Sequence, residues 1–226
     1  MKRSAFLAPA VVLGASLITA QGRPPNRAVP LEPIDAIVEA FRSYDLVALG
    51  DPHGNEQVAE LRLRLIRDSR LPGLVHDIVV EFGNAGHQDV VDRFVNGEDV
   101  PDAVLRQVWQ DTSVAGTTWD VPVYEQVYRA VRSVNESLPS ERRMRVLLGD
   151  PPVEWENVRA ARDVLQAPSD RDTFPAALIQ REVLARGRRA LIVYGDGHFW
   201  RRYPSMTDKS IVGWLEAAGA SVFSIT

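Results

Sequence analysis

Five short, largely apolar runs constrain the fold of this sequence more than any other feature. They are LVALG at 46–50, DIVVEFG at 77–83, MRVLLG at 144–149, ALIVYG at 190–195 and SVFSI at 221–225. A strand that is apolar on both faces has to be covered on both sides, which is typical of a parallel sheet between layers of helices. The sequence therefore predicts an α/β domain with a mostly parallel sheet and helices on both of its faces.

Amphipathic stretches between these runs predict the covering helices. Two of them place apolar residues at helical spacing, namely Val58, Leu61, Leu65 and Ile66 in the first and Val123, Val127, Val131 and Val134 in the second. Gly97, Gly187 and Gly219 stand where helix C-caps are expected. The irregular stretch over 95–121 predicts a small helical cap at one end of the sheet.

The beginning of the chain has the pattern of a secretory leader. Basic residues precede an apolar run from Ala5 to Ile18, and small residues follow it. The run is too short to span a bilayer comfortably, although an uncleaved membrane anchor is the alternative interpretation. We expect a signal peptide over 1–22 that is cleaved after Ala20 or Gly22, and an exported protein that is periplasmic or secreted.

Composition narrows the possible functions of the rest of the chain. We expect a proline-rich lead-in over 23–35 and a single α/β domain over 36–226. The chain has no cysteine, which excludes thiolate catalysis, cysteine zinc sites and a lipid anchor at the leader. Its 26 basic and 30 acidic residues give a net charge of −4, which does not favour nucleic acid as a partner.

Reactive side chains follow the ends of the first four predicted strands. They are Asp51 and His53, then Glu81, then Asp150, and finally Asp196 and His198. In an open parallel sheet, ligands bind beyond the carboxyl ends of the strands, which meet at one edge. We therefore expect these side chains to gather at one rim of the sheet.

Two kinds of chemistry suit such a set. A divalent metal ion could be held by Asp51, His53, Glu81 and His198, with one coordination position left open. Alternatively, His53, Glu81 and His198 could act directly on water as general base and acid. Both chemistries activate water.

A functional or paired role is favoured for Glu81 because a buried carboxylate needs a partner.

Four further residues are candidates for substrate contact or for support of the site. Asp150 and Asp196 follow glycine in turns where aspartate commonly binds backbone amides, so a structural role is open for both. His87 is either an exposed residue at a helix start or a rim residue. Arg201 could neutralise a carboxylate or an anionic substrate, or it could be a solvated loop residue.

The chain resembles the superfamily that groups erythromycin esterase-like hydrolases with ChaN-like haem-binding proteins and, more distantly, Tiki and TraB proteins. The resemblance covers about 36–226 and is closest on the ChaN-like side. LVALGDPHGN is similar to the family's first strand and Gly-acid-x-His turn, and DIVVEFGNAGHQDVVDRFVNGEDV is similar to its second strand, glutamate, glutamine and following helix. VWQDT, TTWDVPVYEQV and RVLLGDPP continue the resemblance in the same order.

The esterase relatives imply that His53 and Glu81 form a water-activating pair with His198 as the third member, and that Asp51 replaces the usual glutamate. Other relatives imply a divalent metal at this rim. The ChaN-like relatives imply haem held between two subunits, and hence a homodimer, in iron uptake at a bacterial envelope. The large helical additions of macrolide esterases are missing from this sequence, which argues against macrolide hydrolysis.

Three hypotheses follow from the residues and the resemblance together. The first is an exported hydrolase of ester or amide bonds with a small-molecule substrate. The second is a haem-binding protein that uses an apolar face with Trp109, Trp119 or Trp200 and an axial tyrosine or histidine. The third is a non-catalytic, degenerate family member in which the rim side chains only satisfy one another.

Overall fold

Strands that are parallel throughout form a single open sheet in the order β3-β2-β4-β1-β5. Their bounds are β1 Leu46–Gly50, β2 Asp77–Asn84, β3 Arg145–Asp150, β4 Ala190–Tyr194 and β5 Val222–Ile225. Each strand coincides with one of the apolar runs; side chains on both faces are buried in β1 to β4, whereas β5 buries Val222 and exposes Phe223. The predicted α/β class is therefore confirmed, and the last strand, β5, lies at one edge of the sheet.

The computed structural model describes residues 29–114, 116–164, 170–201 and 209–226. The predicted signal peptide over 1–22 and residues 23–28 of the predicted lead-in lie outside the described residues. Residues 31–226 form one compact unit. Among the described residues, no helix has both the length and the apolar character that a membrane crossing requires.

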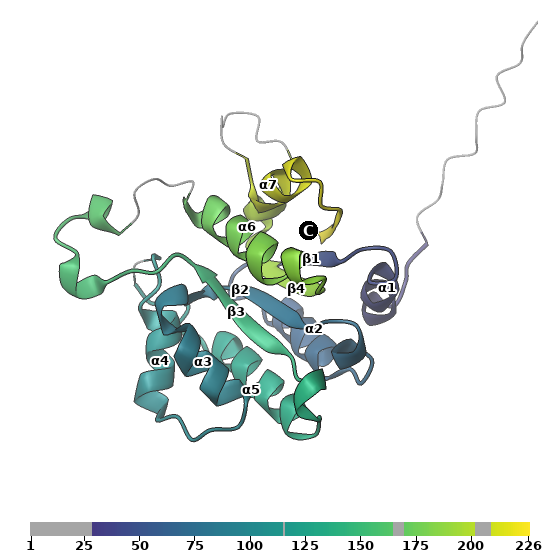
Figure 1. Cartoon of the computed structure of the whole chain (residues 1–226), viewed down its shortest axis with the longest axis horizontal. Helices are drawn as coiled ribbons and strands as arrows, with labels where there is room; N and C mark the ends of the chain where they lie inside the picture. The colour runs from purple at the N-terminus through teal and green to yellow at the C-terminus, as the bar shows by residue number, and fades with distance from the viewer. Residues whose placement is uncertain (1–28, 115, 165–169, 202–208) are drawn as a thin grey trace, which may run out of the picture. The chain divides into compact units, whose positions relative to one another are not determined.

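Helices cover both faces of the sheet, as predicted (Figure 1). One face is packed by α1 Pro33–Ala40, α2 Glu56–Arg67, α3 Gln88–Val95, α4 Asp102–Gln110 and α5 Pro122–Glu136. The other is packed by α6 Asp170–Glu182 and α7 Ile211–Ala217. The predicted cap region contains α4, whose Leu105, Val108 and Trp109 belong to the buried core of the first face.

The domain begins slightly earlier than the predicted residue 36. Helix α1 starts at Pro33, where the fixed φ of proline suits the first helical turn. The carboxylate of Glu32 caps this turn by accepting from the backbone N–H groups of Ile34 and Asp35. Ile34 and Ile37 are buried, so this turn belongs to the domain and not to an extended lead-in.

The pleat of β2 directs its side chains alternately into the two helical layers. Ile78, Val80 and Phe82 belong to the core that includes α2 and α5, whereas Val79 belongs to the core under α6 and α7. By the same alternation, Glu81 lies on the side of α6 and α7. The register between β2 and β3 shifts just after Val80, and a bulge of this kind commonly redirects side chains beside a functional site.

The outer edge of β3 is covered by two side-chain amides. The Gln88 amide donates to the carbonyl oxygen of Val146 at 2.8 Å and accepts from the N–H of Leu148 at 2.9 Å. Asn135 makes the same pair of bonds with Met144, at 2.8 and 2.9 Å. An edge strand normally leaves such groups open to another strand. Here these backbone groups are already paired within the chain.

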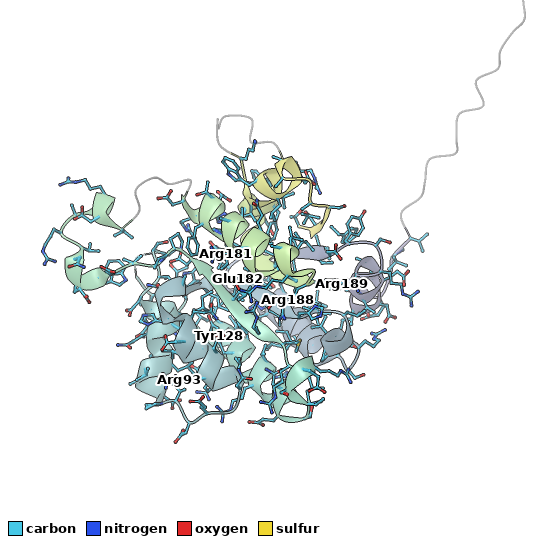
Figure 2. The ribbon with its side chains drawn as sticks, viewed as in Figure 1. Arg93, Tyr128, Arg181, Glu182, Arg188 and Arg189 are labelled. Carbon is cyan, nitrogen blue, oxygen red and sulfur yellow. The ribbon has the colours of Figure 1, made fainter. Side chains whose placement is uncertain are left out.

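The amino ends of the strands carry an ion-pair cluster around the buried carboxylate of Asp77. Arg188 Nε lies 2.6 Å from one carboxylate oxygen and Arg145 Nε lies 2.8 Å from the other. Figure 2 shows Arg188 beside Arg189, near Glu182 at the end of α6. This cluster ties the sheet to its flanking segments at the edge opposite to the candidate site.

Candidate functional site

A crevice is expected beyond the carboxyl ends of β2, β4 and β1, because the chain leaves these neighbouring strands toward opposite faces of the sheet. After β1 and β2 the chain continues to α2 and α3 on one face, whereas after β4, which lies between them, it continues to α7 on the other face. Ligands bind at such switch points in open α/β sheets because diverging loops leave space between neighbouring strands. His53, Glu81 and His198 come from the ends of these three strands and meet there.

Glu81 is buried at the centre of the site, surrounded by donors. One carboxylate oxygen accepts a hydrogen bond from the guanidinium of Arg171 and lies 3.3 Å from His198 Nε2. The other accepts from the backbone N–H of Gly195 at 2.7 Å. Burial by itself would raise the pKa of Glu81, but the bonds from His198, Arg171 and Gly195 outweigh it and lower this pKa below the usual value. Glu81 is therefore a carboxylate with partners, as expected.

His198 lies between two carboxylates. Its Nδ1 is 2.8 Å from Asp172 Oδ1, and the same Asp172 oxygen accepts from the backbone N–H of Ile211 at 3.1 Å. Burial would lower the pKa of His198, but the bonds to Asp172 and Glu81 raise it to about 9. At neutral pH the ring is an imidazolium that donates from both nitrogens.

His53 is the member of the set that faces the solvent, with its side chain 43% exposed. Its Nδ1 lies 3.6 Å from Asp51 Oδ2 and its Nε2 lies 4.0 Å from Glu81 Oε2. The ring packs edge-on against Trp119, with the ring centroids 4.8 Å apart. The neighbouring Asp51 carboxylate raises the pKa of His53 above its usual value. The His53 imidazole is therefore open to solvent, held in place between Asp51 and Trp119, and more basic than an ordinary histidine.

Asp51 supports His53 from the side of α2. Its Oδ1 lies 3.2 Å from the fully buried guanidinium of Arg62, which stands over the rings of Phe82 and Tyr124. Burial opposes ionisation of Asp51, but His53 and Arg62 outweigh it and lower its pKa. The Arg62 nitrogens have no hydrogen-bond partner among the described residues, so the contact with Asp51 is an ion pair without hydrogen-bond geometry.

The two aspartates in Gly-Asp turns have supporting positions. Asp150 is buried and accepts from the N–H and hydroxyl of Ser113 at 2.5 and 2.6 Å, and it lies 3.9 Å from Arg171 Nε. Burial raises the pKa of Asp150 to about 6, although Ser113 and Arg171 oppose the shift. Asp196 packs its carboxylate over Gly50, where a Cβ atom would lie 1.9 Å from Oδ1. A side chain at position 50 would therefore require the Asp196 carboxylate to move.

Two further candidates have partners away from the central set. His87 Nε2 lies 2.9 Å from Asp111 Oδ2, which links the start of α3 to the end of α4. Arg201 donates to the Glu216 carboxylate at 2.9 Å and to the carbonyl oxygen of Val222 at 3.0 Å. The structure thus brings together His53, Glu81, His198 and Asp51, with Asp150 next to them, and places His87 and Arg201 in other contacts.

Several partners of the site come from helices and were not expected from the strand ends. Arg171 and Asp172 lie in the first turn of α6, behind a long irregular segment that gives no sequence signal for their position. Arg62 could have been noticed, because it occupies the apolar face of α2 between Ala59 and Ile66. A charged residue on a buried helical face requires a partner, and here that partner is Asp51.

The four residues predicted to hold a metal ion, Asp51, His53, Glu81 and His198, have side-chain partners in this structure, and the metal site stays a prediction. One oxygen of Asp51 faces the guanidinium group of Arg62 and one oxygen of Glu81 faces that of Arg171, while the second oxygen of each carboxylate faces His53. Within the described ranges, no group of three or more histidine, aspartate or glutamate side chains is placed to hold a metal ion. A cation at Glu81 Oε1 would compete with Arg171 for that oxygen.

Two of the three tryptophans proposed for a planar ligand are buried. Trp109 stacks on Tyr128 with ring centroids 5.9 Å apart. Trp119 is 2% exposed and packs against His53, Phe82 and Tyr124. Neither offers an open face to haem in this conformation.

Comparison with known proteins informs the fold alone. No protein-family model matches the chain, and no curated protein matches it. The structure of the type III effector HopBA1 is similar, with a TM-score of 0.51 and 19% sequence identity, over 84% of this chain and 81% of that chain. The likeness therefore extends over most of both chains and is consistent with the open α/β architecture.

Proposed function

We propose that this protein hydrolyses ester or amide bonds of a small-molecule substrate, with His53 as the general base. The observation that carries the proposal is the position of the His53 imidazole. It is solvent-accessible, with Asp51 behind its Nδ1 and the buried Glu81 carboxylate 4.0 Å from its Nε2. The resemblance to erythromycin esterase-like and ChaN-like sequences supports the same residues, and we propose membership of that superfamily.

The separation between His53 and Glu81 suits a bridging water. It is too long for a direct hydrogen bond, but a water molecule can bond to both groups across it. His53 Nε2 takes a proton from this water as the oxygen attacks the carbonyl carbon of the substrate. Asp51 stabilises the imidazolium that forms, and Arg62 holds Asp51 as a carboxylate.

The remaining charges favour the transition state. Attack places negative charge on the carbonyl oxygen, and the cationic groups of Arg171 and His198 lie beside Glu81 to stabilise it. The C–O or C–N bond of the tetrahedral intermediate then breaks, and the proton held by His53 passes to the leaving alcohol or amine. Asp172 and Gly195 act as positioning groups because they orient His198 and Glu81.

Turnover of p-nitrophenyl esters and of the corresponding anilides tests this function. We expect His53→Ala and Glu81→Gln to lower kcat/KM by about 10²-fold or more, since general base catalysis contributes roughly that factor. His76→Ala is the matched control, because His76 lies before β2 at the opposite edge of the sheet. Folded His53→Ala protein with wild-type turnover would refute the proposal.

We also propose that the protein is exported. The support is the sequence pattern over 1–22, which lies outside the described residues. Intact-mass measurement of the protein recovered from a periplasmic or culture fraction tests this point. A mass that corresponds to a start after Ala20 or Gly22 is expected, whereas full-length protein in the cytosol alone would contradict it.

A further inference from the structure

An open hollow of about 500 Å³ lies beside the site, on the inner side of the segment 151–164. This segment, the green stretch beyond β3 in Figure 1, extends away from the sheet before the chain returns to α6. The residues that line the hollow are Ser113, Trp155, Val158, Arg159, Ala160, Ala161 and Val164. Its volume lies in the ordinary range for small-molecule sites.

A short series of contacts connects this hollow with the central carboxylate. Ser113 donates from its hydroxyl to Asp150 at 2.6 Å. Asp150 lies 3.9 Å from Arg171 Nε, and Arg171 donates to Glu81. Only two side chains, those of Asp150 and Arg171, therefore separate Ser113 in the lining of the hollow from Glu81, which places the hollow next to the candidate site.

The polar groups in the wall of the hollow already have partners. The indole N–H of Trp155 donates to the carbonyl oxygen of Asp111 at 2.8 Å. The backbone N–H groups of Arg159 and Ala160 donate to Asp163 Oδ2 at 2.9 and 2.7 Å. Arg159 Nη1 donates to the carbonyl oxygens of Glu156 and Val158. The wall therefore offers a ligand mainly apolar surface.

We propose that this hollow binds the apolar acyl chain of the substrate, so that the enzyme acts on esters or amides of medium-length aliphatic acids. The inference rests on the proposed function, because hydrolysis at His53 is what places the acyl carbonyl at the rim. An acyl chain needs no hydrogen bonds, and it gains free energy by leaving water for an apolar wall.

Binding of acetate, butyrate, hexanoate and octanoate tests the inference without any turnover. These probes carry the acyl half of the substrate, and NMR titration of the Trp155 indole and Ala161 amide signals reports their site. We expect about fourfold tighter binding for each methylene group that is fully buried, which corresponds to about 0.8 kcal/mol per methylene. Octanoate no tighter than acetate would overturn the inference.

Ala161→Trp fills the hollow from its exposed wall, and we expect it to weaken octanoate binding at least tenfold while acetate binding stays unchanged. Ala217→Trp, at the exposed end of α7, is the matched control and should bind octanoate like the wild type. Unchanged octanoate binding by Ala161→Trp would overturn the inference. His53→Ala separates the two proposals, since it should lose turnover and keep octanoate binding.

Discussion

Arg171, from the first turn of α6, donates a hydrogen bond to the buried carboxylate of Glu81 on β2. This contact joins a helix of one layer to the centre of the sheet, at the point where the candidate site is assembled. It also explains how a carboxylate that is only 3% exposed stays ionised among apolar strands.

Replacement of Arg171 by methionine should destabilise the fold, because it leaves the Glu81 charge buried without its guanidinium partner. Loss of one partner of a buried pair costs about 3 kcal/mol. Urea unfolding at pH 7 measures the change. Arg181→Met, at an exposed position of the same helix, should cost much less. Equal losses for the two variants would contradict the role assigned to Arg171.

The pH dependence of kcat/KM should be bell-shaped. His53 acts as a base only when its imidazole is neutral, so kcat/KM increases as the pH rises through the pKa of His53. Asp51 raises this pKa above the usual histidine value. His198 stabilises negative charge only when protonated, so activity falls as the pH passes its pKa of about 9. Initial rates between pH 5 and 10 check both limbs. A flat profile above neutral pH would contradict the role of His198.

Asp51→Asn should move the acidic limb of that profile to lower pH. The carboxylate next to Nδ1 favours the imidazolium form of His53, so its removal lowers the pKa of the ring. NMR titration of the His53 Cε1–H signal measures this shift directly. The same signal in Asp111→Asn, which changes the partner of His87, should stay at its wild-type pKa.

Activity should survive removal of divalent metals. The carboxylates of Asp51 and Glu81 are held by guanidinium groups, so no step in the proposed mechanism requires a cation. Dialysis against EDTA followed by assay in chelated buffer tests this expectation. If turnover is lost and then restored by added zinc or manganese, the result would contradict this expectation and support a metal-dependent hydrolase.

Gln88→Ala should open the outer edge of β3. It removes the amide that pairs with Val146 and Leu148, and exposed strand edges recruit other strands. We expect concentration-dependent association in sedimentation velocity experiments. Gln126→Ala, at an exposed position of α5, is the matched control and should sediment like the wild type.

The sheet and the strand-end part of the site could be predicted from the sequence because both are local features. An apolar run marks a buried strand, and the residues after it are carried to the rim by the parallel arrangement. His53, Glu81 and His198 therefore meet as expected. The contacts of Arg201 and His87 could not be predicted, because their partners Glu216 and Asp111 come from α7 and the end of α4, whose positions depend on packing.

The helical half of the site depends on packing across the whole chain. Helix α6 has no clear apolar stripe and contains Pro175, so its sequence gives little sign of a helix, and its place over the sheet follows from burial of Leu178 and Ile179. Only that placement brings Arg171 and Asp172 to the strand ends. The pairing of Asp51 with Arg62 likewise needs α2 docked on the opposite face.

The residues of the site are divided between the two helical layers, so catalytic activity depends on the docking of both layers. Asp51 and Arg62 are set by the layer that contains α2, whereas Arg171, Asp172 and His198 are set by the layer that contains α6 and α7. The full set of site contacts forms only when both layers are docked on the sheet. We therefore expect turnover to return during refolding only after secondary structure has recovered.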